Sequence, residues 1–169
     1  QGLFEKTDRA QDEKPHHSHI LLAGRPKKVS GNCAACTIEG TRPIIAEIQA
    51  LVCPTAFPSP RRTSNGVDYN RMCLLLAVLE KRLGLRFSAN DVYINVIGGL
   101  RLDEPASDLA AALAMISSIT DKIISDDLVA IGEVGLAGEC RAVASLENRV
   151  REVERLGFSR AVVPARSIE

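Results

Sequence analysis

The amino-acid sequence predicts a mixed α/β domain of the two-layer α+β kind. Segments rich in β-branched residues alternate with segments of helical periodicity, in the order ββ-α-β-α-ββ-α-β. The chain has 169 residues, of which 46% are hydrophobic and 25% charged, a composition typical of a globular domain with its own core. No internal repeat is visible, so we expect one packed domain.

The first part of the chain differs from the rest. Residues 1–31 contain all three histidines and show little periodicity, so we interpret them as an extended arm and place the packed domain at 32–169. The chain begins with Gln, so we expect a fragment, with the arm leading from a missing ATPase core. Because the sequence shows neither a signal peptide nor a membrane-spanning apolar run, we expect a cytoplasmic protein without a membrane partner.

The packed domain is expected to begin with a β-hairpin. Two β-branched runs, 33–40 and 42–54, are separated by a short Gly-Thr turn. Segment 55–66 is rich in Pro, Ser and Gly, so we expect a loop. Residues 67–85 have apolar positions every three or four residues, which predicts a helix that ends near Gly84.

The second half of the domain repeats this alternation. Segment 91–99 alternates in polarity and predicts a strand, whereas 104–121 predicts a helix that is apolar nearly all round and therefore buried. Segment 127–143 predicts two strands joined by a Gly-rich turn. Residues 145–158 predict an amphipathic helix, and 160–165 a final strand.

The cysteines allow a metal-site hypothesis, which the spacing does not favour. Cys33 and Cys36 form a C-x₂-C pair that follows three histidines, and such a set could hold zinc. However, zinc fingers place the histidines after the cysteines, and residues three apart in a strand face opposite sides. We therefore expect no metal site and interpret the cysteines as reduced thiols. They are Cys33, Cys36, Cys53, Cys73 and Cys140.

No phosphate-binding loop is present in the sequence. The glycines at 98–99 and 132–138 are not followed by the Lys and Ser/Thr of a P-loop, so we expect no ATP site and no cofactor in this chain. Because the net charge is zero, nucleic acid would have to bind a local basic patch. Arg61 and Arg62, with Arg71 nearby, could contact phosphates or simply form a solvated surface.

Ser107 stands near the start of a predicted helix, where free N–H groups favour negative charge and nucleophiles are often held. A serine nucleophile needs a base, and the nearest lysine in sequence, Lys122, lies beyond the other end of this helix. The local sequence therefore favours Ser107 as a capping residue that accepts a hydrogen bond from a free N–H.

Four longer segments carry a family resemblance. They are "TIEGTRPIIAEIQALV", "PRRTSNGVDYNR", "LLLAVLEKRLGLRFSANDVYINVIGGLRLDEPASDLA" and "GEVGLAGECRAV". Together they resemble the C-terminal domain of the RadA (Sms) family of bacterial DNA-repair proteins, from about Ile20 to Arg166. That domain looks like the proteolytic domain of Lon protease, a Ser–Lys peptidase. The resemblance thus implies a fold of the ribosomal protein S5 domain 2-like type.

The resemblance also implies that the peptidase dyad is lost. Lon carries its nucleophile in a Pro-Ser-Ala-Gly motif and its base in a Leu-Lys-Glu-Lys motif. Pro105 matches the first motif and Ala106 takes the place of the serine, while Arg149 takes the place of the lysine. Alanine has no nucleophilic oxygen and arginine stays protonated, so the domain is expected to be a pseudo-peptidase. Arg149 could then bind phosphate or pair with an acid such as Asp108.

The family further implies a role in recombinational DNA repair. RadA resembles a hexameric, ATP-driven branch-migration helicase, so ATP, Mg and Zn are implied for the parent protein outside this chain. The chain itself is expected to be a non-enzymatic, ring-forming homo-hexameric scaffold that binds single-stranded or branched DNA beside a RecA-type recombinase at the bacterial nucleoid. The candidate DNA-binding residues are Arg61, Arg62, Arg71, Arg82, Arg101 and Arg149.

Two other functions compete with this interpretation. A residual peptidase would use Ser107 and cleave unstructured protein. A competence-type protein related to magnesium chelatase would share the same fold, although the "TRP" and "PRRT" signatures argue against it.

Overall fold

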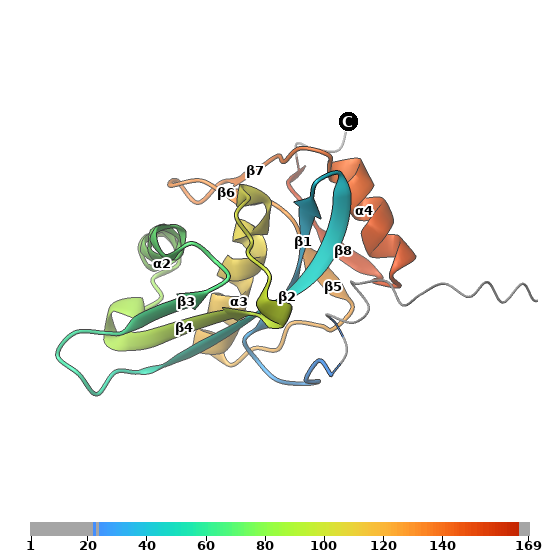
Figure 1. Cartoon of the computed structure of the whole chain (residues 1–169). Coiled ribbons are helices and arrows are strands. Elements are labelled where there is room, and N and C mark those ends of the chain that lie inside the picture. The colour runs from blue at the N-terminus through green and yellow to red at the C-terminus, as the bar shows by residue number, and fades with distance from the viewer. Residues whose placement is uncertain (1–21, 23, 166–169) are drawn as a thin grey trace, which may run out of the picture.

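The computed structural model describes residue 22 and residues 24–165, and a six-stranded β-sheet forms its centre (Figure 1). The strands are β1 (Asn32–Glu39), β2 (Arg42–Pro54), β3 (Arg62–Asn65), β4 (Asn90–Val96), β5 (Leu128–Ala130) and β8 (Arg160–Val162). Their order in the sheet is β3-β4-β2-β1-β5-β8. β2 is antiparallel to both of its neighbours, and the outer pairs β3–β4, β1–β5 and β5–β8 are parallel.

Helices cover both faces of this sheet. The helical elements are α2 (Tyr69–Leu83), α3 (Asp108–Thr120), α4 (Leu146–Arg155) and the 3₁₀ turns η1 (Phe87–Ala89), η2 (Ile97–Gly99) and η3 (Pro105–Ser107). α2 and α3 share one apolar core with the sheet, and α4 packs in a second core on the opposite face. A separate two-stranded hairpin, β6 (Glu133–Val134) and β7 (Cys140–Arg141), lies above the sheet in Figure 1. None of the helices in the described ranges is long and apolar enough to cross a membrane.

The predicted hairpin is confirmed, and its residue alternation explains the two cores. β1 and β2 pair in register from Asn32↔Gln49 to Glu39↔Arg42. Ile48 faces the α2–α3 side, whereas Ile45 faces α4, because successive side chains in a strand point to opposite faces. Both side chains are fully buried, so β2 holds the two layers together.

α2 has the start and stop signals that its sequence predicts. The side chain of Asp68 accepts a hydrogen bond from the Arg71 N–H at 2.8 Å and caps the first turn. Gly84 ends the helix in the left-handed conformation, at φ 68°.

α3 is buried, as predicted, and its small residues allow a close approach to the sheet. Two serines near its end complete the attachment. The hydroxyl of Ser117 accepts a bond from the Gly31 N–H at 2.8 Å, and that of Ser118 accepts one from Val52 at 2.9 Å. These bonds satisfy backbone N–H groups that would otherwise be unpaired inside the protein.

Two local predictions were wrong. Segment 55–66 is not all loop, because its last residues form β3 and pair with β4 at the sheet edge. The turn-forming composition was overridden by the hydrogen bonds that β4 offers to a neighbouring strand. Segment 127–143 forms three short strands instead of two, since β5 joins the main sheet and only β6 and β7 form the Gly-turn hairpin.

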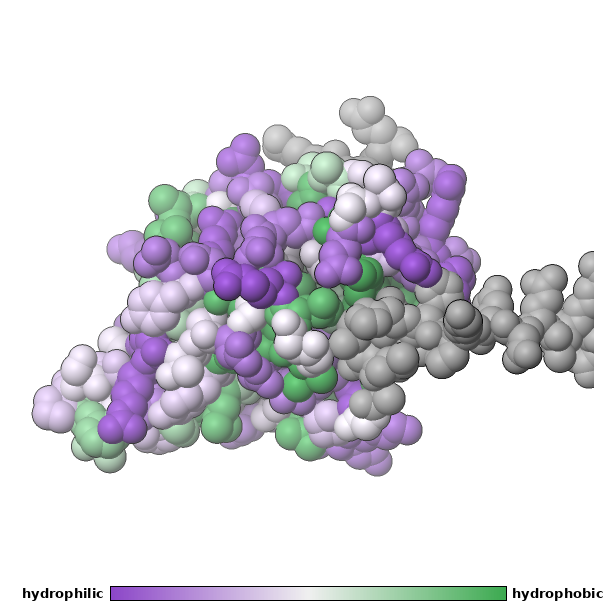
Figure 2. Space-filling view, viewed as in Figure 1, coloured by the Kyte–Doolittle hydropathy of each residue, from purple (hydrophilic) through white to green (hydrophobic). Residues whose placement is uncertain are grey.

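The connection between β2 and β3 projects from the body of the molecule at the left of Figure 1. Figure 2 shows hydrophobic and hydrophilic residues side by side at this projecting end. Phe57 in this connection is 45% exposed. The ring of Phe57 lies under the guanidinium of Arg61, at 3.7 Å from the centroid, which is a cation–π contact.

Candidate functional site

Ala106, which the resemblance aligns with the nucleophilic serine of Lon, lies in η3, where this turn leads into α3. Ala106 is 2% exposed, and its carbonyl accepts a hydrogen bond from the Gly132 N–H at 2.9 Å. The carbonyl of Gly132 in turn accepts one from Leu109 at 3.0 Å. The start of α3 is therefore fixed against the β5–β6 connection, and the side chain at position 106 carries no nucleophilic atom.

The prediction that Ser107 caps α3 is wrong. Its hydroxyl donates to the Glu104 carbonyl at 2.9 Å, and no side-chain cap is made to a free N–H. The reason is its backbone, which is helical (φ −87°, ψ −5°) because η3 runs directly into α3, whereas a capping residue needs an extended backbone. Ser107 is 4% exposed. Lys122 lies past the far end of α3, about 20 Å along the helix.

Arg149, the other dyad position, is held in an internal ion pair. Its side chain is 2% exposed, and its nitrogens donate to Glu104 Oε1 at 2.5 Å and Oε2 at 2.7 Å. It also donates to the carbonyls of Cys36 at 2.8 Å and Ala144 at 3.0 Å. Of the two roles left open by the sequence, the structure shows the ion pair, and the acid is Glu104 rather than Asp108.

Glu104 was missed by the sequence reasoning, although it stands two residues before Ala106. Burial raises the pKa of its carboxyl, but the hydrogen bonds and charge of Arg149, with bonds from Thr37 and the Ile38 N–H, lower that pKa below its ordinary value overall. The pair joins α4 to the start of η3. These elements carry Arg149 and Ala106, the positions that the resemblance aligns with the base and the nucleophile of Lon.

Arg71 and Asp108 form a second ion pair close by. Asp108 is 3% exposed and accepts from Arg71 Nε at 2.9 Å, from its second guanidinium nitrogen, and from the Val134 N–H at 3.1 Å. Arg71 also donates to the Val134 carbonyl at 3.0 Å. The hydrogen bond to Asp108 raises the pKa of Arg71, so the guanidinium stays charged. This pair joins α2, α3 and β6.

The hollow beside this pair, of about 220 Å³, has an acidic lining. Four carboxylate residues and a single arginine contribute to it: Asp68, Asp103, Glu104, Asp108 and Arg71. Because like charges repel at short range, a phosphate group would be disfavoured here. This acidic hollow is therefore a poor site for phosphate binding.

The remaining candidate arginines come from separate elements. Arg62 is half-buried, and its guanidinium donates to the carbonyls of Asn90 at 2.5 Å and Phe87 at 2.8 Å. Arg101 is highly exposed and lies 3.5 Å from Asp103. The exposed Arg82 packs its stem against Gly138, where an added Cβ would come within 3.1 Å of it. Arg61, above Phe57, is the most accessible cation of the β2–β3 connection.

The two cysteines of the C-x₂-C pair lie on opposite faces of β1, as their spacing predicts. Cys33 belongs to the α2–α3 core and Cys36 to the α4 core. Burial raises the pKa of each thiol to about 12, so neither is a ready thiolate. Within residues 22 and 24–165, no three His, Cys, Asp or Glu residues gather to hold a metal ion. His16, His17 and His19 lie outside the described residues.

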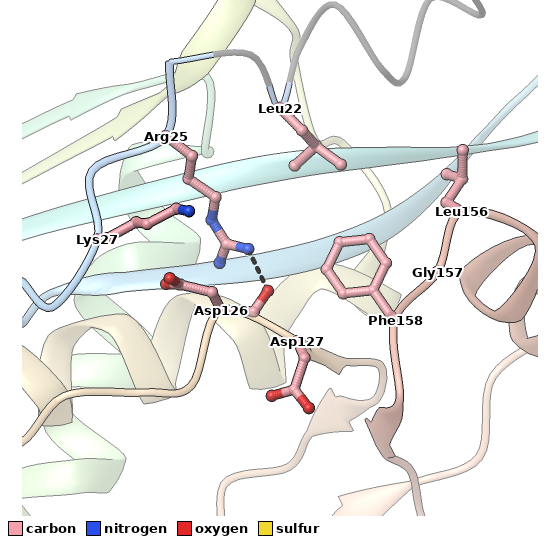
Figure 3. Close-up of a pocket in the computed structure, with 8 residues that line it drawn as sticks. All are labelled: Leu22, Arg25, Lys27, Asp126, Asp127, Leu156, Gly157 and Phe158. Atoms are coloured by element: carbon pink, nitrogen blue, oxygen red, sulfur yellow. Dashed lines mark hydrogen bonds between the residues drawn. The ribbon is translucent and has the colours of Figure 1, made fainter.

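Figure 3 shows a larger hollow, of about 450 Å³, between Leu22, Arg25 and Lys27 and the turn after α4. The Arg25 guanidinium donates to the Asp126 carbonyl at 2.7 Å, the bond dashed in Figure 3, and pairs with Glu47 at 2.7 Å. Hydrogen bonds from Arg160, Ser125 and Ser159 lower the pKa of Asp127 strongly. The Arg25 bonds attach residues 24–27 to the domain, whereas the Asp127 bonds join the segment before β5 to β8.

Comparison with known proteins identifies the family. The family described as subunit ChlI of Mg-chelatase matches residues 74–167. DNA repair protein RadA from Synechocystis is 45% identical over 96% of this chain, and the Bacillus subtilis RadA is 45% identical over 99%. The RadA of Streptococcus pneumoniae is 44% identical over 99% of the chain.

The chain spans 32%, 37% and 40% of the lengths of these three relatives, respectively. Their similarity confirms the predicted RadA resemblance, and the family match agrees with the observed α/β fold of the Lon-like type. The chain therefore belongs to the family of subunit ChlI of Mg-chelatase, and nearly its whole length is similar to part of the DNA repair proteins named RadA.

Proposed function

We propose that this chain is the DNA-binding and ring-forming scaffold of a RadA-type DNA repair protein, and that it has no peptidase activity of its own. The similarity to RadA over 96–99% of the chain supports the repair role. In this proposal the parent is a cytoplasmic, hexameric, ATP-dependent branch-migration helicase that works with a RecA-type recombinase. ATP, Mg and Zn would bind outside this chain.

The observation that carries the loss of peptidase activity is the Arg149–Glu104 pair. A general base must be unprotonated so that it can accept the proton of the nucleophile, and an arginine held by two carboxylate oxygens stays protonated. With Ala106 in place of the nucleophile, neither half of the dyad remains. Ser107 would need a base, and no lysine lies beside it along α3.

A second candidate is a magnesium-chelatase-related competence protein, favoured by the ChlI match to residues 74–167. We favour the RadA-type role because the RadA relatives cover nearly the whole chain, the hairpin and the β2–β3 connection included.

Three of the candidate DNA-binding arginines already have partners within the chain. The guanidiniums of Arg62, Arg71 and Arg149 already donate to groups within the chain. We therefore propose that Arg61 contributes most of the phosphate binding, with Arg82 and Arg101 as outer contacts. An exposed guanidinium retains the free donors that phosphate recognition needs.

The test is fluorescence anisotropy of a single-stranded oligonucleotide across a salt series. Arg61→Ala is expected to reduce the slope of log affinity against log salt by about one unit, because one phosphate contact is lost. The matched control is Arg151→Ala, since Arg151 is 70% exposed on α4. No binding by the unaltered chain would overturn the DNA-binding proposal, and a light-scattering mass of a monomer with DNA present would overturn ring formation.

A further inference from the structure

On the face opposite α2 and α3, no helix of the described residues lies over β3, β4 and the part of β2 from Gln49 onward. α2 and α3 cover the other face of these strands, and α4 packs over β1 and its neighbours. On the uncovered side, residues 26–32 and the three strands enclose a hollow of about 500 Å³. Its lining contains no charged residue: Pro26, Val29, Ser30, Asn32, Gln49, Ala50, Leu51, Thr63, Asn65, Tyr93, Ile94 and Asn95.

A row of four amide side chains crosses this face. The strand registers align Asn32 with Gln49, Gln49 with Asn95, and Asn95 with Asn65, so one amide stands on each of four adjacent strands. Asn65 Nδ2 donates to Asn95 Oδ1 at 2.7 Å. The Nδ2 of Asn32 is buried and has no hydrogen-bond partner among the described residues, so this end of the row is unsatisfied within the fold.

Tyr93 occupies the centre of the next row. It lies between Leu51 on β2 and Thr63 on β3 in the strand register. Leu51 is 60% exposed, although leucine is usually buried. A half-buried tyrosine ring on an open pleated sheet, flanked by an apolar neighbour, is a platform on which a flat ring can stack.

The acids on this face are buried and hydrogen-bonded. Glu47, 1% exposed, pairs with Arg25 at 2.7 Å and accepts a bond from Gln49 at 2.9 Å. Asp91 accepts a bond from the Arg61 N–H at 2.7 Å, and this bond lowers the pKa of its carboxyl. Both carboxylates are buried and neither lines the hollow, whose floor presents amides, hydroxyls and a ring.

Cations lie at the rim of this neutral floor. Lys27 and Lys28 are exposed next to Pro26 and Val29, which line one side. Arg61 is exposed and directly precedes β3, the strand that carries Thr63. A polymer with neutral rings and anionic links would meet complementary groups across the whole hollow.

We propose that this uncovered face binds two or three unpaired bases of single-stranded DNA. One base stacks on Tyr93, the amide row hydrogen-bonds base edges, and Arg61 and Lys28 hold the flanking phosphates. The inference rests on the proposed DNA-binding function and assigns its site. It favours a nucleic acid over an extended peptide, because four amides in line offer both donors and acceptors in the plane of a base edge.

The chain offers a direct optical test, since it contains two tyrosines and no tryptophan. In a Tyr69→Phe background, Tyr93 is the remaining tyrosine, and its emission should be quenched on addition of an oligo(dT) strand. Tyr93→Ala should weaken oligo(dT) binding about tenfold with an unchanged salt slope, because a stacking contact is lost and no phosphate contact is. Tyr93→Phe, which keeps the ring, should restore the affinity.

An abasic strand of the same length separates stacking from phosphate contacts. The unaltered chain and Tyr93→Ala should bind it equally. If oligo(dT) binding depends on Arg61 but not on Tyr93, and no quenching is seen, base binding by the uncovered face is overturned while the proposed function stands. If Tyr93→Ala lowers the light-scattering mass and leaves DNA affinity unchanged, the face contacts protein instead, which also overturns the inference.

Discussion

Two polar regions of this molecule use their side chains in opposite ways. At the start of α3, an ion-pair corner consists of Arg149–Glu104 and Arg71–Asp108, and each of these arginines is bound to a carboxylate from a distant segment. On the uncovered sheet face, four amides and Tyr93 carry no charge, and Asn32 has an unpaired donor. In the first region the arginine donors are bound within the fold, whereas the second is the surface for which we propose a ligand.

The difference follows from the cost of burying charge. An arginine that is 2% exposed cannot remain charged in a protein core without a partner, because desolvation of a lone ion costs several kcal/mol. Glu104 meets this need with two oxygens. A neutral amide on an open face needs no counter-charge.

The largest expected effect is the loss of the buried pair. Glu104→Ala should lower the free energy of unfolding by about 3 kcal/mol, because Arg149 is then left buried without a counter-charge. Urea denaturation followed by circular dichroism measures the change. The preceding residue, Asp103, supplies the control, since it pairs with Arg101 at 3.5 Å and both side chains are 69–77% exposed.

Asp103→Ala should therefore change the unfolding free energy by less than about 1 kcal/mol. Equal changes in the unfolding free energy for the two substitutions would show that the Arg149–Glu104 pair does not stabilise the ion-pair corner. The same result would remove the contrast with the sheet face.

The pH dependence of this pair is expected to be smaller. The pKa of Glu104 is lowered in the folded chain, so its contribution to stability is present above the ordinary carboxyl value of 4.5 and is lost as the pH falls through that value toward the folded pKa. The difference in unfolding free energy between the unaltered chain and Glu104→Gln should thus shrink below about pH 4.5. A difference that stays constant from pH 7 to pH 3 would contradict this assignment.

Much of the fold could be predicted from local pattern, because most of its strands and helices follow the spacing of apolar residues. β3 could not, since Arg62–Asn65 has a turn-like composition and is a strand only beside β4. The amide row was hidden for the same reason, because it is assembled from four strands, one of which was expected to be loop. The family resemblance identified Ala106 and Arg149, but the partner Glu104 emerged only from the packing of α4.

The smallest expected effect concerns the sheet face itself. Leu51 is 60% exposed, so Leu51→Ala should change the unfolding free energy by at most about 0.5 kcal/mol, as for other surface substitutions. Ile48, three residues earlier on β2 and fully buried, is the matched control, and Ile48→Ala should cost about 2–5 kcal/mol. Urea denaturation at several protein concentrations measures both. A cost above 1 kcal/mol for Leu51→Ala that grows with protein concentration would mean that another copy covers this face in solution. The face would then be a structural contact, like the ion-pair corner, and not a surface for binding DNA.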